Sequence, residues 1–81
     1  MTEAQKLTLK VEAAIKRADP TVITERTFYD EVSDRLFVTV FKGPRKTELM
    51  FFVREYNNGD AEQIARVVER SLERLKRTPI G

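Results

Sequence analysis

Two neighbouring segments of the chain carry apolar side chains at consecutive positions, and this pattern constrains the fold more than any other feature of the sequence. The segments 35–42 and 47–56 are rich in β-branched and aromatic residues and predict β-strands. Because successive side chains of a strand point to opposite faces, both faces of the predicted sheet are apolar. An antiparallel sheet with one side in water alternates apolar with polar residues instead. The fold therefore has two apolar sheet faces to cover.

The two faces of the predicted sheet differ in the kind of side chain they carry. One face is mainly aliphatic and comprises Leu36, Val38, Val40, Leu49, Phe51 and Val53. The other is mainly aromatic and comprises Phe37, Phe41, Met50, Phe52 and Tyr56. The apolar stripes of the predicted helices are small and aliphatic. We therefore expect the helices to pack on the aliphatic face and to leave the aromatic face open.

Helices are predicted on both sides of the strand region. Apolar residues from Ala4 to Ala18 recur every three or four positions, which predicts an amphipathic helix that Thr2 caps and Asp19-Pro20 ends. A second helix is predicted after the break at 57–59, because Asp60 and Gln63 match a capping box.

A further strand is predicted over residues 21–29, ahead of the other two. The connections 30–34 and 43–46 are short and favour antiparallel hairpins. The expected fold is α+β in the order α-β-β-β-α, a three-stranded antiparallel meander with two helices packed on one face. We expect one domain over residues 1–81. Glu25 and Arg26 put one charge on each side of the first strand, so its faces stay unassigned.

The composition excludes most enzyme chemistry. The 81 residues include no cysteine, histidine or tryptophan, and the net charge is +2. Thiol nucleophiles, imidazole bases and the usual zinc ligands are therefore missing. Asp30, Glu31 and Asp34 fall in a predicted solvent-facing turn, where nothing positions a substrate. We expect no enzyme, catalytic residue, cofactor or metal site. No apolar run is long enough to span a membrane, so we expect a cytoplasmic protein without membrane contact.

The open aromatic face and the small size of the chain together predict self-association. A domain of this length buries only about 60 to 65% of its unfolded surface, and association is a common way to add stability. We expect a non-enzymatic interaction module that forms a homodimer through Phe37, Phe41, Met50, Phe52 and Tyr56, or through a sheet edge. Three alternatives stay open for these rings. Twist, a bulge or the termini shelter them within one chain, they stack on single-stranded nucleic acid, or they form a small-molecule or peptide site.

Basic residues supply an alternative function. Lys42, Arg45 and Lys46 surround the predicted hairpin turn, and Arg54 lies beside the aromatic residues. These four side chains are candidate contacts for an anion or for nucleic acid, which would be bound weakly and in a salt-sensitive way.

The element order resembles that of double-stranded-RNA-binding domains and of a family of small dimeric nucleoid-associated DNA-binding proteins. The RNA-binding family is expected to carry a Gly-Pro-x-His loop after its first strand and a lysine-rich start to its last helix. Here Gly43-Pro44 follows the second predicted strand without a histidine, and the last helix begins Asp60-Ala61-Glu62-Gln63. No functional residue is therefore transferred from either family.

Overall fold

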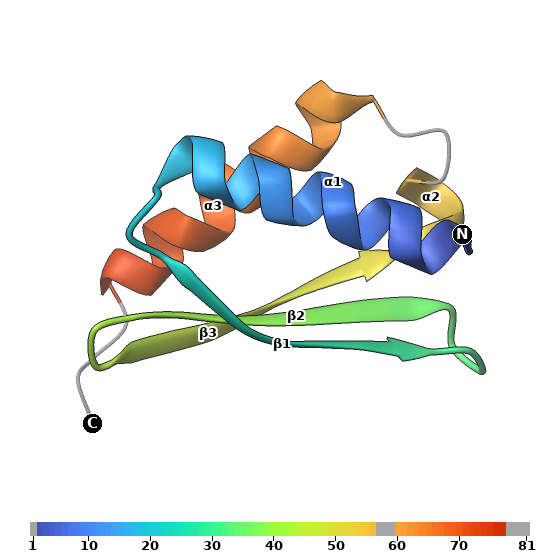
Figure 1. The fold of residues 1–81 in the computed structure, drawn as a ribbon, viewed down its shortest axis with the longest axis horizontal. Helices are drawn as coiled ribbons and strands as arrows, with labels where there is room; N and C mark the ends of the chain where they lie inside the picture. The colour runs from blue at the N-terminus through green and yellow to red at the C-terminus, as the bar shows by residue number, and fades with distance from the viewer. Residues whose placement is uncertain (1, 57–59, 78–81) are drawn as a thin grey trace.

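The computed structural model describes residues 2–56 and 60–77. Its elements are α1 (Glu3–Ala18), β1 (Ile23–Asp30), β2 (Arg35–Lys42), β3 (Arg45–Phe52), α2 (Val53–Tyr56) and α3 (Ala61–Arg77). The strands form one antiparallel sheet in the order β1-β2-β3, and α1 and α3 lie together on one side of it (Figure 1). The predicted α+β order, the meander and the one-sided helix layer are confirmed. The predicted break at 57–59 lies outside the described residues.

Capping residues determine where the two long helices begin. The backbone N–H of Gln5 donates to Thr2 Oγ1 at 3.1 Å, and the N–H of Thr2 donates to Gln5 Oε1 at 2.9 Å. This reciprocal pair satisfies donors that have no partner inside α1. At the start of α3, the Asp60 carboxylate accepts the N–H of Glu62 at 3.1 Å. Both helices therefore begin close to the positions that the sequence predicts.

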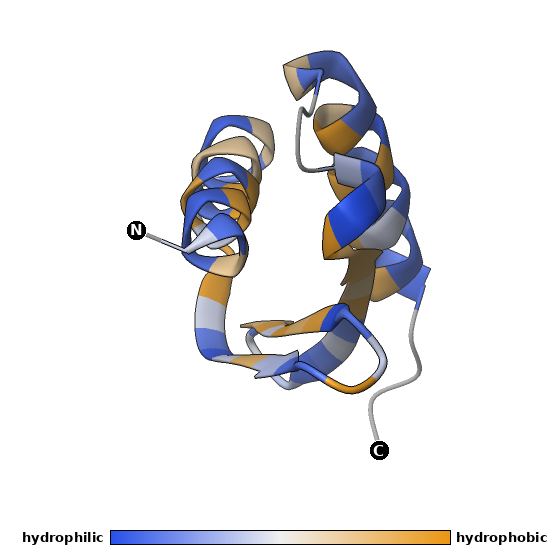
Figure 2. Cartoon of the chain, turned by 90° about the vertical axis from the view of Figure 1, so that its right-hand side faces the viewer, coloured by the Kyte–Doolittle hydropathy of each residue, from blue (hydrophilic) through white to orange (hydrophobic). Residues whose placement is uncertain are grey.

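The hydrophobic core lies between the helix layer and the aliphatic sheet face. Figure 2 shows α1 and α3 side by side above the sheet. The strands contribute five of the six residues predicted for this face, and the sixth, Val53, is the first residue of α2 instead. All six are buried: Leu36, Val38, Val40, Leu49, Phe51 and Val53. The helices contribute Leu7, Val11 and Ile15 of α1 and Ile64, Val68, Leu72 and Leu75 of α3. The helices therefore cover the aliphatic face, as predicted.

The third strand ends four residues earlier than predicted. β2 begins at Arg35, which pairs with Phe52, so residues after Phe52 have no strand beside them. Instead, the N–H of Val53 donates to the Asp34 carbonyl oxygen at 3.0 Å, and the N–H of Arg54 donates to Asp34 Oδ2 at 2.9 Å. The chain turns there into the short helix α2. The predicted strand over 47–56 was therefore wrong at its C-terminal end, and it also begins two residues earlier, at Arg45.

A bulge in β1 explains why the faces of this strand are hard to assign from the sequence. Thr24 pairs with Val40 and Arg26 with Thr39, so Glu25 is an extra residue between them. An inserted residue reverses the alternation of side chains along a strand. As a result, Arg26 and Phe28 lie on the sheet face opposite the helices.

Candidate functional site

The sheet face opposite the helices, here called the open face, is made of four rows of side chains that run across the three strands. The rows are Ile23–Phe41–Lys46, Arg26–Thr39–Glu48, Phe28–Phe37–Met50 and Asp30–Arg35–Phe52. Within residues 2–56 and 60–77, no helix covers this face (Figure 1). One row therefore consists entirely of large apolar side chains.

The apolar side chains of the open face shelter one another only in part. The Phe28 and Phe37 rings are stacked at 25° with centroids 6.5 Å apart, and the Arg35 guanidinium lies 5.4 Å from the centre of the Phe52 ring. Even so, Phe28 is 52% exposed and Met50 is 40% exposed. Large apolar area on one surface is typical of an interaction site.

Four of the five residues predicted for the self-association face do lie together. Phe37, Phe41, Met50 and Phe52 are all on the open face. Tyr56 is not, and its predicted place there was wrong. It belongs to α2, packs against the core, and meets the Phe51 ring edge-on at 5.3 Å. The reason is that β3 ends at Phe52, so the alternation that put Tyr56 beside Phe52 stops before it.

Sequence reasoning missed two apolar residues of the open face, Phe28 and Ile23. Both are more than half exposed, at 52% and 54% respectively. They lie on either side of the bulge at Glu25, so no single alternation places both of them on this face. The adjacent charges Glu25 and Arg26 were the only sequence signal of that irregularity.

The four cations predicted as anion contacts do not form one cluster. Lys42, Arg45 and Lys46 lie at the β2–β3 hairpin, whereas Arg54 lies at the opposite end of the sheet beside Asp34. Lys42 forms an ion pair with Asp19 and Lys46 one with Glu25, each at 2.8 Å. Arg45 is half-buried, and among the described residues its buried Nε has no hydrogen-bond partner. Arg54 in turn lies 3.8 Å from Asp34 Oδ2, so three of the four charges are already paired within the chain.

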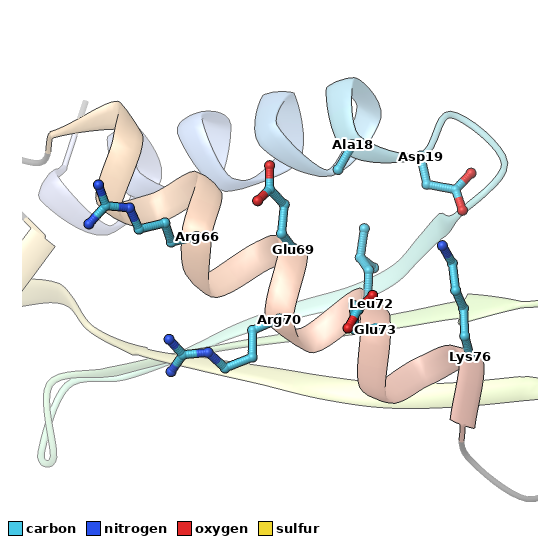
Figure 3. A pocket seen from close by; sticks show the side chains of 8 residues that line it. All are labelled: Ala18, Asp19, Arg66, Glu69, Arg70, Leu72, Glu73 and Lys76. Carbon is cyan, nitrogen blue, oxygen red and sulfur yellow. The ribbon is translucent and has the colours of Figure 1, made fainter.

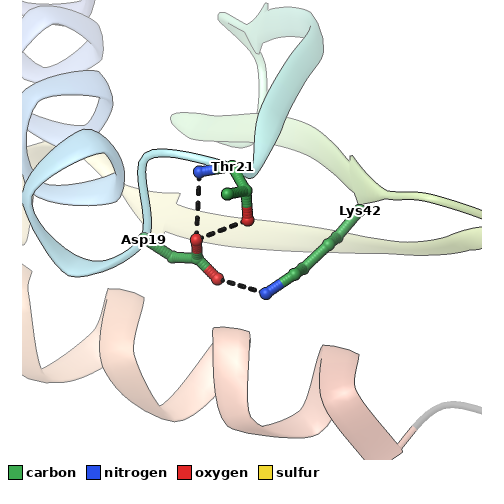
Figure 4. Close-up of polar contacts among 3 residues, drawn as sticks. All are labelled: Asp19, Thr21 and Lys42. Carbon is green, nitrogen blue, oxygen red and sulfur yellow. Dashed lines mark hydrogen bonds and ion pairs between the residues drawn. The ribbon is translucent and has the colours of Figure 1, made fainter.

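The Asp19–Lys42 pair is part of a small polar cluster that joins the end of α1 to the sheet (Figure 4). Asp19 Oδ1 accepts the Thr21 N–H at 3.0 Å and the Thr21 hydroxyl at 2.6 Å, while Oδ2 accepts Lys42 Nζ at 2.8 Å. The hydrogen bond from Lys42 and those from Thr21 favour the carboxylate form, so they hold the pKa of Asp19 well below its ordinary value of 3.8.

This cluster makes stability depend on pH. Because the pKa of Asp19 is lower in the folded state than in the unfolded chain, its contribution is present at neutral pH and is lost as pH falls below the ordinary carboxyl range. We expect Asp19→Asn to have a lower free energy of unfolding than the wild type at neutral pH. The difference between the two proteins should become smaller as the pH falls toward about 2. Urea unfolding of both proteins at a series of pH values measures this difference in free energy. A difference that did not change with pH would contradict a role for the carboxylate charge.

A hollow of about 550 Å³ lies between the end of α1 and one side of α3 (Figure 3). Its lining comprises Ala18, Asp19, Arg66, Glu69, Arg70, Leu72, Glu73 and Lys76. The α3 charges alternate in sign and their side chains are exposed, which is typical of the solvated face of a helix. In the part of the chain that the structure describes, no three Asp or Glu side chains are grouped as metal ligands would be. No described helix is long and apolar enough to span a membrane.

Comparison with known protein families, with curated proteins and with solved structures finds no match to this chain.

Proposed function

We propose that this protein is a small, non-enzymatic, cytoplasmic interaction module that forms a homodimer, with the open face as its contact surface. The observation that carries the proposal is the row Phe28–Phe37–Met50, whose large apolar side chains are adjacent on one sheet face and remain partly in water. Burying such a surface against a second copy removes apolar area from water, which is the main driving force of protein association.

The size of the open face sets the strength expected of this contact. Three strands of eight residues, spaced about 4.8 Å apart and rising about 3.4 Å per residue, give a face of about 400 Å². Two such faces in contact bury about 800 Å² in total, which is below the usual range of stable, specific interfaces. We therefore expect a dimer with a micromolar Kd.

The face is a better contact surface than the edge of β1. The bulge at Glu25 interrupts the regular spacing of hydrogen-bonding groups along this edge, and bulges of this kind disfavour pairing with another strand. The alternative function, nucleic-acid binding, gains no support from the cations, because Lys42 and Lys46 are paired with carboxylates and Arg54 lies at the far end of the sheet.

A matched pair of substitutions tests the proposal. Phe28→Asp puts a charge at the most exposed ring of the open face and should raise the dimer Kd by about 30-fold or more, equivalent to roughly 2 kcal/mol. Val32→Asp makes the same change in charge at a residue that is 98% exposed in the β1–β2 turn, away from the face, and should leave the Kd unchanged. Sedimentation velocity over a concentration series measures both values.

Two outcomes would overturn the proposal. One is a wild-type protein that remains a monomer up to high micromolar concentration. The other is a dimer that Phe28→Asp and Val32→Asp affect equally. Titration of the wild type with labelled single-stranded DNA at two salt concentrations tests the alternative function, and tight binding that Phe28→Asp abolishes would favour it over self-association.

A further inference from the structure

One row of the open face carries two opposite charges that form no ion pair with any other described residue. In the row Arg26–Thr39–Glu48, the arginine is on one edge strand and the glutamate on the other, with Thr39 between them. Both charged side chains are exposed. Within the described residues, neither of them forms an ion pair. The row also lines a shallow hollow of about 340 Å³, shared with Phe28 and Phe37.

The other charged residues of the open face already have partners. Lys46 forms its ion pair with Glu25 at 2.8 Å. Asp30 accepts hydrogen bonds from the Val32 N–H and the Ser33 hydroxyl, and Arg35 lies over the Phe52 ring. Arg26 and Glu48 are thus the two charges on this face that a partner has to satisfy, because a charge covered by a protein surface without a counter-charge is costly.

A second copy of the chain satisfies both charges in one arrangement. Consider two open faces in contact, related by a two-fold axis that runs between the sheets along the direction of β2. This rotation places β1 of one protomer over β3 of the other. Each row of side chains then faces the same row of the partner subunit, in the opposite order. Arg26 then faces Glu48 of the partner subunit, and the same contact occurs a second time by symmetry. In the apolar row, Phe28 meets Met50 of the partner subunit and Phe37 meets its own copy.

Other two-fold arrangements of the same faces leave the charges unsatisfied. An axis across the strands at Thr39 brings Arg26 against its own copy and Glu48 against its own copy, which is repulsive. An axis across the strands at Phe37 brings Arg26 to Asp30 of the partner subunit but covers Glu48 with a phenylalanine ring. The arrangement along β2 places Asp30 against Phe52 of the partner subunit, but Asp30 keeps its hydrogen bonds from the Val32 N–H and the Ser33 hydroxyl. The only like charges it brings together are the two Arg35 side chains, which lie at the end of the sheet where solvent screens them.

We infer that the homodimer proposed above, on which this inference rests, is a face-to-face sandwich whose two-fold axis runs along β2, fixed by reciprocal Arg26–Glu48 ion pairs between the subunits. The apolar row provides most of the affinity. The ion pairs select the orientation, because opposite charges that meet at an interface specify register more than they add affinity.

Charge reversal at the two positions tests the orientation. Arg26→Glu faces Glu48 of the partner subunit with a like charge, and Glu48→Arg does the same to Arg26, so each single variant should raise the dimer Kd by about tenfold or more. The double variant, Arg26→Glu with Glu48→Arg, restores both pairs with reversed sign. Its Kd should return to within a few-fold of the wild type. Lys6→Glu, an equal change of charge on α1 away from the open face, is the control and should leave the Kd unchanged.

The outcomes separate this inference from the proposed function. A dimer that Phe28→Asp weakens, but in which the double variant is no tighter than either single variant, would overturn the axis along β2 and leave self-association through the open face intact. A different result would establish the axis across the strands at Phe37 instead. In that case Asp30→Arg, and not Glu48→Arg, would restore the dimer Kd of the Arg26→Glu variant. Melting temperatures taken at concentrations where monomer predominates check that each variant is folded, since all these side chains lie at the surface.

Discussion

Replacing Phe51 by alanine is expected to lower the free energy of unfolding by about 3 to 5 kcal/mol, whereas the same replacement at the next residue, Phe52, should cost about 1 kcal/mol or less. Phe51 is 1% exposed, lies beneath the helices and contacts the Tyr56 ring edge-on at 5.3 Å. Its removal leaves a cavity that the surrounding core fills only in part. Phe52 lies on the open face beside Arg35, where water can occupy the space left by the ring.

The comparison is informative because the two residues are adjacent and identical. A domain of this size is stable by only about 5 kcal/mol, so Phe51→Ala should leave a large unfolded fraction at room temperature. Denaturant unfolding of both variants, at concentrations where monomer predominates, measures the difference. Equal losses of stability would mean that the assignment of the two sheet faces is incorrect.

The second large effect is expected on α1. Val11 is 0% exposed and lies between the helix layer and the sheet, so Val11→Asp buries a carboxylate without a counter-charge and should cost at least about 4 kcal/mol. Leu9, two residues earlier in the same helix, is 53% exposed. Leu9→Asp should lower the free energy of unfolding by about 1 kcal/mol or less. Most of this loss comes from the lower helix propensity of aspartate, which affects both variants alike.

Far-ultraviolet circular dichroism during thermal unfolding measures this second pair. The expected result is a protein that is unfolded at room temperature with Val11→Asp and cooperatively folded with Leu9→Asp. A folded Val11→Asp protein with a near-normal melting temperature would mean that Val11 is not buried between α1 and the sheet.

The sequence predicted the helices, the meander and the face that the helices cover because those features depend on local patterns. The C-terminal end of β3 could also have been predicted from the sequence, but the predicted strand was too long at this end. Gly43 and Pro44 form a two-residue turn in which Gly43 adopts a φ of +60°, a conformation that glycine tolerates. Counting back from this turn pairs Arg35 with Phe52, and the turn before Arg35 leaves nothing to pair with Val53. The prediction extended the strand to Tyr56 because the residue types continue to favour a strand.

The partners of the hairpin cations could not be predicted from local patterns. Asp19 reaches Lys42 because α1 ends at the same end of the sheet as the hairpin, and Glu25 reaches Lys46 across the open face although the residues are far apart in sequence. Such contacts depend on strand register and on the bulge, and a shift of one residue would remove them. The sequence therefore indicated a concentration of basic residues at the hairpin but not the carboxylates that neutralise part of it.

Asp34 links the fold to the availability of its exposed surface. Its left-handed backbone, with a φ of +59°, and its hydrogen bonds to Tyr29 and to the first residues of α2 direct the polypeptide away from the aromatic side as soon as the last strand is complete. Val53 and Tyr56 consequently contribute to the interior instead of folding back over Phe52. Residues that stabilise the monomer and residues that would bind a second subunit thus occupy opposite sides of the same strands, so substitutions can alter assembly with little effect on folding.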